Sequence, residues 1–288
     1  MLSMIVDDVR EPAWNLALDE ALARVPGPRG RRAVRRGGRT PGLRTMPPPR
    51  PGVPRLGAPS GSAAAERGPV LRVWQNAPSV VIGRFQNVEE VVDLAACARD
   101  GVRVVRRASG GGAVYTDSGT LLFSLVRRPR AGERRFPAEW PDLDVLVGTA
   151  LGRLGCPPEA LAGGGIVQTA RLRTREAVLT HLAVHVTPIN AYGPAYLMPP
   201  SAGGPGASPG GGERRTLADL GMPITLDAVR AAVLSEIMDV YGIARTRRPD
   251  PGEQAVRDHL YSVRYGDVTW NLSRPAGPRR AAREFTGG

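Results

Sequence analysis

Three consecutive glycines, Gly110 to Gly112, follow a serine near the middle of the chain and are the first sign of chemistry. Glycine adopts positive φ and permits close backbone approach, so successive N–H groups of such a loop can converge on one anionic oxygen. Arg106 and Arg107 add fixed positive charge in a planar fork that suits phosphate or carboxylate. The spacing matches neither a P-loop nor the Gly-x-Gly-x-x-Gly turn of dinucleotide-binding folds. The segment therefore predicts a site for an anion of another class, although most glycine-rich turns are only turns.

Other reactive side chains are sparse. Cys97 and Cys156 are the two cysteines of the chain, and they are too few for a disulfide framework and not clustered with histidine as in a structural zinc site. His181 and His185 alternate on one face of a predicted strand, where they either line a pocket or simply pack. The sequence therefore indicates neither metal nor redox chemistry.

Positive charge is concentrated in one segment. The formal net charge is +12, the chain contains no lysine, and residues 26–68 hold ten arginines against one glutamate. The same segment has nine prolines, nine glycines and no apolar periodicity, which predicts a disordered insertion. The rest of the chain is nearly neutral. Because basic low-complexity tracts bind polyanions without specificity, nucleic acid is the lowest-ranked partner.

The elements that must position the glycine loop follow from apolar spacing, helix caps and turn residues. In chain order we predict a helix over 11–24, a β-hairpin from strands at 71–74 and 79–83, a helix over 88–99 capped by Asn87, a strand over 102–106 leading into the loop, a strand over 119–126, a helix over 141–154 stopped by Gly155, a strand over 176–186 and a helix over 226–241.

This order predicts an α+β fold with mixed, mainly antiparallel sheets packed with helices. We expect one domain over residues 1–288, interrupted by the insertion at 26–68 and by a second Pro/Gly-rich break at 199–212, with a helical C-terminal segment over 226–272. No stretch reaches the roughly 18 to 20 apolar residues of a membrane span, and the N-terminus has no signal-peptide pattern. The cytoplasm is the expected location, without a membrane partner.

The segment from Arg106 to Asp117 resembles a family signature, Arg-Arg-x-Ser-Gly-Gly-Gly-Ala-Val-(Tyr/Phe)-His-Asp, except that Thr116 stands at the histidine. The signature is that of the lipoate-protein ligase A family, in the biotin/lipoate protein ligase catalytic domain superfamily. Supporting matches are Asn15-Leu16-Ala17-Leu18-Asp19-Glu20, Trp74-Gln75-Asn76, Val80-Val81-Ile82-Gly83-Arg84-x-Gln86-Asn87, Leu217-Ala218-Asp219-Leu220-Gly221 and Tyr265-x-x-x-x-Trp270-Asn271.

The resemblance implies a biotin/lipoate ligase-like catalytic domain that condenses lipoate with ATP, with Mg²⁺, to an acyl-adenylate. The acyl group then passes to a lysine of an acceptor: a lipoyl domain of a 2-oxoacid dehydrogenase complex, or glycine cleavage H protein. It is compatible with a monomer. By position, the adenylate contacts would come from Arg107, Gly112, Ala113, Val114 and Tyr115, the pocket would be shaped by Ser109, Gly110 and Gly111, and Asp117 would orient the loop.

One family residue is missing. Members carry a lysine in a Lys-x-Ser/Ala-Gly-x-Ala-Gln motif, and alignment places Ala162 or Gly165 in that slot, after a shortened stretch from Cys156. Losing one preorganised charge stabiliser costs about 10² to 10³ in rate, so adenylation is expected to be weak or absent. Arg171, Arg173 or Arg175 could substitute electrostatically for the missing lysine, but a planar guanidinium is a poor replacement for a compact ammonium.

Three functions stay open on these residues. The first is a lipoate- or octanoate-protein ligase or acyltransferase with impaired activity. Related octanoyltransferases use a cysteine just upstream of the lysine motif as nucleophile, which makes Cys156 a candidate, although a buried packing role is favoured. The second is a non-catalytic protein that binds lipoate or an acceptor domain, and the third is nucleic-acid binding through the arginine-rich insertion.

Overall fold

A computed structural model describes residues 1–26, 68–129, 141–162, 165–187, 193–198 and 215–273. The predicted insertion and the predicted break at 199–212 lie outside the described residues, apart from the insertion's end residues Pro26 and Gly68. None of the helices in the described ranges is long and apolar enough to cross a membrane.

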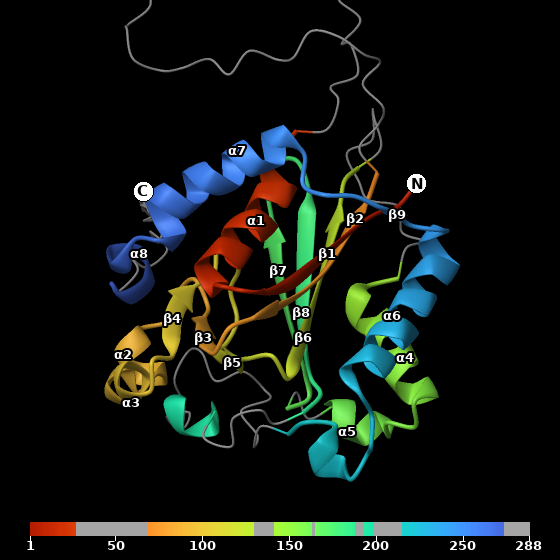
Figure 1. Cartoon of the computed structure of the whole chain (residues 1–288), viewed down its shortest axis with the longest axis horizontal. Helices are drawn as coiled ribbons and strands as arrows, with labels where there is room; N and C mark the ends of the chain where they lie inside the picture. Colours follow the sequence, from red (N-terminus) through yellow and green to blue (C-terminus); the bar gives the residue numbers. More distant parts are fainter. Residues whose placement is uncertain (27–67, 130–140, 163–164, 188–192, 199–214, 274–288) are drawn as a thin grey trace, which may run out of the picture.

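Six strands form the larger sheet, in the order β7-β8-β6-β2-β1-β9 (Figure 1). β1 runs parallel to β2 and β9, whereas the β2/β6, β6/β8 and β8/β7 pairs are antiparallel. The strands predicted at 119–126 and 176–186 are confirmed as β6 and β8, and the sequence analysis did not identify β1, β7 or β9. The strands are β1 (Ser3–Arg10), β2 (Val70–Asn76), β6 (Thr120–Arg127), β7 (Val167–Arg173), β8 (Val178–His185) and β9 (Arg245–Thr246).

A smaller sheet of three strands has the order β4-β3-β5, with β3 (Ser79–Ile82), β4 (Arg103–Arg106) and β5 (Val114–Thr116). The predicted β-hairpin at 71–83 is therefore wrong, because β2 and β3 belong to different sheets. The N–H of Ala77 donates to the carbonyl of Arg10, the last residue of β1, and Pro78, with its fixed φ, then redirects the chain. Alternating apolar residues predict that a strand forms but do not specify its partner.

Helices cover both faces of the larger sheet (Figure 1). On one face α1 (Pro12–Arg24) lies beside α7 (Pro251–Leu260), and on the other α4 (Leu143–Arg153) packs against α6 (Leu226–Tyr241). These positions confirm the helices predicted at 11–24, 141–154 and 226–241. The remaining helical segments are α5 (Pro158–Ala162), three short turns at Gly193–Tyr196, Ala218–Leu220 and Tyr261–Tyr265, and α8 (Val268–Leu272).

The helix predicted at 88–99 is divided into α2 (Val88–Val91) and α3 (Leu94–Arg99). Val92 leaves the helical path to form a β-bridge with Leu197, and Asp93 then caps α3 by accepting the Ala96 N–H at 2.8 Å. Asn87 makes no side-chain capping bond. A local tertiary contact and a second capping residue thus override the helical spacing.

Helix α1 lies where the two sheets meet. Its residues Ala13, Leu16 and Ala17 share one buried cluster with Trp74 of the larger sheet and Val105 of the smaller one. The opposite face of the larger sheet forms a separate core with α4 and α6. The polar residues of α1 consequently face a junction to which both sheets contribute.

Candidate active site

The glycine loop is organised from inside by Arg107. Its guanidinium donates to the carbonyls of Gly110 at 2.7 Å, Gly112 at 2.8 Å and Val81 at 3.2 Å. In a trans peptide the carbonyl and the following N–H point in opposite directions, so the N–H groups of Gly111 and Ala113 point away from the guanidinium. Burial lowers the pKa of Arg107 to about 10, which leaves it charged at neutral pH. Arg107 therefore shapes the loop that presents these N–H groups.

Two glycines meet where the loop passes the end of β3. Gly111 has φ of 97°, a conformation that side-chain-bearing residues rarely adopt. A Cβ at Gly83 would stand 1.9 Å from the carbonyl oxygen of Gly111. Both positions consequently require glycine.

Arg106 ties the same loop to the C-terminal helices. Its buried guanidinium donates to the carbonyls of Gln86 at 2.7 Å, Trp270 at 3.0 Å and Ser273 at 3.0 Å. Its own backbone N–H is accepted by the side chain of Asn271 at 2.9 Å. Arg106 is thus committed to holding three chain segments together.

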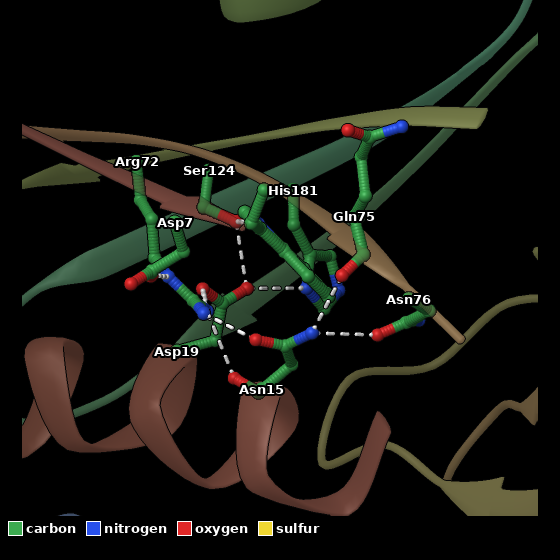
Figure 2. A network of polar contacts seen from close by, with 9 residues as sticks. Asp7, Asn15, Asp19, Arg72, Gln75, Asn76, Ser124 and His181 are labelled. Atoms are coloured by element: carbon green, nitrogen blue, oxygen red, sulfur yellow. Dashed lines mark hydrogen bonds and ion pairs between the residues drawn. The ribbon is translucent and has the colours of Figure 1, made fainter. Parts of the chain in front are cut away.

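A buried polar network joins α1 to the larger sheet, and Figure 2 shows Asn15 and Asp19 pointing from the helix toward the strands. Arg72 of β2 bonds to the Asn15 side chain and, at 3.0 Å, to Asp19. Asn15 donates to Asn76 at 2.9 Å, and Asp19 accepts the Ser124 hydroxyl at 2.7 Å. The network fixes the face of α1 that is turned toward the sheet.

His181 links this network to the glycine loop. Its Nε2 lies 2.6 Å from the Ser109 hydroxyl, and its Nδ1 lies 3.4 Å from Asp19 (Figure 2). Burial by itself would raise the pKa of Asp19, but the hydrogen bond from His181 and the charge of Arg72 outweigh it, so the pKa is lowered. A serine, a histidine and an ionised aspartate therefore form a continuous line from the loop to α1.

A small cavity opens beside this line. Apolar side chains from α1, β7 and β8 form much of its wall, together with the polar residues just described and with Glu20, whose carboxylate accepts the Tyr265 hydroxyl at 2.6 Å. The lining residues are Leu16, Asp19, Glu20, Arg107, Ala108, Ser109, Leu172, Leu179, His181 and Tyr265.

Comparison with known proteins identifies this arrangement. Residues 60–171, which include the glycine loop, match the family model of the lipoyl protein ligase A/B catalytic domain. This part of the chain is therefore similar to that family. The resemblance stated from the sequence is thereby confirmed.

Two curated relatives support this similarity. Lipoate-protein ligase A subunit 1 of Thermoplasma acidophilum is 51% identical over 59 residues, which are 20% of this chain and 22% of the relative. The mitochondrial lipoyl amidotransferase of Homo sapiens is 48% identical over 66 residues, 23% of this chain and 18% of the relative. The matched segments thus span about a fifth of each curated relative.

Solved structures share the fold over nearly the whole chain. A bipartite lipoate protein ligase from Thermoplasma acidophilum, described with its E2 lipoyl domain, has a TM-score of 0.65 and 22% identity, covering 96% of this chain and 98% of that one. A lipoate-protein ligase A bound with ATP has a TM-score of 0.64 and 23% identity, covering 95% and 98%. A P. falciparum protein in complex with lipoate has a TM-score of 0.65 and 15% identity, covering 96% and 75%. The α+β ligase fold is therefore confirmed.

The loop residues predicted from the ligase resemblance take different positions. Ser109 lines the cavity, whereas the Tyr115 ring packs 5.5 Å from Tyr196 on the outer side of the smaller sheet. Asp117 accepts the Gly119 N–H at 2.8 Å and so shapes the turn into β6. Thr116, at the family's histidine position, bonds to Asn76 at 3.0 Å and extends the buried network. The ligand contacts assigned to these residues stay predictions.

The residues around the missing lysine lie apart from the cavity. Ala162 ends α5, on the α4 side of the sheet, and Gly165 is buried just before β7; neither lines the cavity. Arg171, considered as an electrostatic substitute, points to the α4 side and pairs with Asp142 at 3.0 Å. Cys156 packs in the core with α4, and burial raises the pKa of its thiol. The packing interpretation of Cys156 is the one these contacts support.

The two histidines predicted to line a pocket take different positions. His181 lines the cavity, while the Nδ1 of His185 lies 3.1 Å from the hydroxyl of Thr120 on β6. Leu16, Leu172 and Tyr265 were not predicted as cavity residues, although Leu16 and Tyr265 belong to quoted motifs. Within the described ranges, no group of three or more His, Cys, Asp or Glu side chains could hold a metal ion.

Proposed function

We propose that this protein is a lipoate- or octanoate-protein ligase or acyltransferase that passes the acyl group to a lysine of an acceptor lipoyl domain. The observation that carries the proposal is the cavity that runs from apolar side chains to Ser109 of the glycine loop. An acyl chain needs an apolar sleeve for its tail and hydrogen-bond donors at its carboxyl end. This cavity supplies both.

The tail would lie between α1 and strands β7 and β8. Leu16, Leu172 and Leu179 contribute apolar wall from these three elements. Lipoate and octanoate are both slim, largely apolar chains, and the lining does not separate them.

The reacting carboxyl group would lie against the glycine loop. The N–H groups of Gly111 and Ala113, turned away from Arg107, can donate to the oxygens of an acyl-phosphate as negative charge develops. ATP supplies the adenylyl group that activates the carboxylate, and an amine of the acceptor then displaces AMP. Without the family lysine, the two anions are brought together with one cation fewer, so adenylation is slowed about 10²- to 10³-fold.

The acceptor is a protein of the lipoyl-domain class, either from a 2-oxoacid dehydrogenase complex or glycine cleavage H protein. The structural neighbour described with its E2 lipoyl domain supports this class. The test combines the full chain, ATP, magnesium, lipoate or octanoate and a purified lipoyl domain, with the acceptor mass read by mass spectrometry. Parallel reactions replace ATP and free acid by octanoyl-carrier protein.

Acylation of the acceptor under either condition supports the proposal. Gly111→Val, which conflicts with φ of 97° and brings a Cβ to 2.8 Å from Arg107, should abolish it. Gly152→Ala, where an added Cβ meets nothing within 4 Å, is the matched control and should retain activity. An acceptor that stays unmodified with every acyl donor rejects the catalytic proposal.

The absent lysine favours a second candidate, a non-catalytic protein that binds lipoate or the acceptor domain. Calorimetric titration with lipoate, octanoate and the lipoyl domain tests it. Binding without acyl transfer supports this candidate, and the absence of heat with all three ligands rejects it.

A further inference from the structure

We propose that Ser109 is an acyl-accepting nucleophile, activated by His181 and positioned by Asp19, and that it takes the acyl group from a thioester. The inference rests on the proposed function for the class of acyl group. It adds a covalent route that needs neither ATP nor the missing lysine.

The geometry is that of a nucleophile, a base and an orienting carboxylate in one line. Ser109 Oγ lies 2.6 Å from His181 Nε2, and His181 Nδ1 lies 3.4 Å from Asp19 Oδ2. A neutral imidazole with its proton on Nδ1 would donate to Asp19 and accept the Ser109 hydroxyl at Nε2. This tautomer gives His181 a lone pair directed at the hydroxyl proton.

Asp19 is held as an ionised carboxylate, the form that can orient His181. Asp19 receives hydrogen bonds from Arg72 at 3.0 Å and Ser124 at 2.7 Å, which fix both of its oxygens. Burial by itself would raise the pKa of Asp19, but the hydrogen bond from His181, the charge of Arg72 and the hydrogen bond from Ser124 outweigh it and lower the pKa, so Asp19 is ionised at neutral pH. An ionised Asp19 stabilises the imidazolium that forms when His181 accepts a proton.

The nucleophile faces the cavity assigned to the acyl chain. Ser109 and His181 are 2% and 9% exposed, and both line the cavity. Their low exposure excludes bulk water, which would otherwise hydrolyse an acyl ester. Leu16 and Leu172, from opposite sides, provide the apolar contact for a chain whose carbonyl reaches Ser109.

The chemistry balances in two transfers. In the first, Ser109 Oγ bonds to the thioester carbonyl carbon, His181 takes the hydroxyl proton, the C–S bond breaks and the thiol leaves with that proton. In the second, the acceptor lysine's amine attacks the acyl-serine, the C–O bond breaks, the amine proton passes to His181, and Ser109 Oγ recovers a proton. Nothing is oxidised or reduced, and the thioester is the only co-reactant besides the acceptor.

The experiment exposes the full-length protein to the N-acetylcysteamine thioester of octanoate, quenches it with acid, and maps adducts by mass spectrometry. We expect one octanoyl group on the peptide containing Ser109, no adduct there in Ser109→Ala, and adduct formation slowed about 10²- to 10⁴-fold in His181→Gln. Ser262→Ala, at an exposed serine that does not line the cavity, is the matched control and should acylate like wild type.

Asp19 acts through His181 and is therefore tested as a positioning residue. Asp19→Asn should slow acylation while the calorimetric affinity for octanoate stays within about twofold, because it alters the tautomer of His181 rather than the apolar wall. If Asp19 had a purely structural role, Asp19→Asn would lower affinity and acylation together.

Circular dichroism excludes unfolded variants. If Ser109→Ala misfolds, Ser109→Cys, which keeps a nucleophile at this position, should still form an adduct.

An adduct on another residue, or one that persists in Ser109→Ala, overturns the inference. So does a wild-type protein that binds octanoate by calorimetry but forms no adduct. If the acceptor is acylated with ATP and free acid while the thioester gives no adduct, the proposed function stands and the acyl-serine route fails. If neither donor acylates the acceptor but Ser109 is acylated, the inference stands and the transfer to a lipoyl domain fails.

Discussion

Arg106 and Trp270 exchange two hydrogen bonds across 164 positions of sequence: the arginine Nε donates to the Trp270 carbonyl at 3.0 Å, and the indole N–H donates to the Arg106 carbonyl at 2.9 Å. Asn271 adds a third bond to the Arg106 backbone. The residue before Arg107 is therefore fixed by the C-terminal helix α8. The motif at the end of the chain and the glycine-loop motif act as one structural unit.

Asn271→Ala should weaken this unit. The substitution leaves the buried Arg106 N–H and the Tyr265 carbonyl without the amide that joins them, at about 1 to 3 kcal/mol for each unsatisfied group. We expect the free energy of unfolding, measured in urea, to fall by about 2 to 6 kcal/mol. Leu272→Ala, at a residue that is 37% exposed, is the neighbouring control and should cost less than Asn271→Ala. Equal losses would contradict a specific role for the amide.

Gly83→Ala should displace the glycine loop. The new Cβ would stand 1.9 Å from the Gly111 carbonyl, so the backbone of one segment must move. We expect octanoate affinity to fall at least tenfold by calorimetry. Gly148→Ala, where the added Cβ meets nothing within 4 Å, should bind like wild type and gain up to about 1 kcal/mol of stability from helix propensity. Unchanged affinity in Gly83→Ala would show that the loop position does not control binding.

Acid should remove the stabilising effect of the buried carboxylates. The pKa of Asp19 is lowered from 3.8 and that of Glu20 from 4.5, because partners led by His181 and Tyr265 outweigh burial. A lowered folded-state pKa contributes stability that is present above the unfolded value and is lost as the pH falls through the folded value.

The stability difference between wild type and Asp19→Asn should therefore be constant above about pH 5 and shrink below about pH 4. Urea unfolding between pH 3 and pH 7 measures this difference. Asp258→Asn, at an exposed residue of α7, is the control and should show a difference near zero throughout. A difference for Asp19→Asn that grows in acid would have the wrong sign.

A lysine introduced in place of the missing family residue should raise adenylate formation most on the cavity side of β7. Leu172 lines the cavity, and the Ala170 Cβ lies 4.0 Å from the position of a Cβ at Gly111. Side chains two residues apart share a face of a strand, which places Gln168 on the same side, nearest the start of β7. Gln168→Lys should therefore raise adenylate formation about tenfold or more, by restoring a charge stabiliser.

Ala162→Lys and Gly165→Lys are the comparison variants. Ala162 is exposed on α5, and a lysine there should leave the rate of pyrophosphate release unchanged. If pyrophosphate release rises with a lysine at residue 162 or 165 but not at residue 168, the lysine position is the one given by sequence alignment.

The sequence by itself determined the family resemblance and the local elements. Short contiguous patterns carry the glycine loop, the α1 motif and the closing tryptophan and asparagine. Their requirements are local: Gly111 needs a positive φ, and α1 needs buried residues at helical spacing. The strands at 119–126 and 176–186 were predictable for the same reason, because apolar residues reveal a strand whatever its partner.

Only the tertiary structure decided which of these patterns meet. β2 and β3 were predicted as one hairpin but lie in different sheets, since alternation carries no information about the pairing strand. Ser109 and His181 are 72 positions apart, and His181 and Asp19 are 162 apart. No local periodicity encodes contacts at such separations; they arise because packing α1 into the junction of two sheets brings a helix, a strand and a loop to one buried cavity.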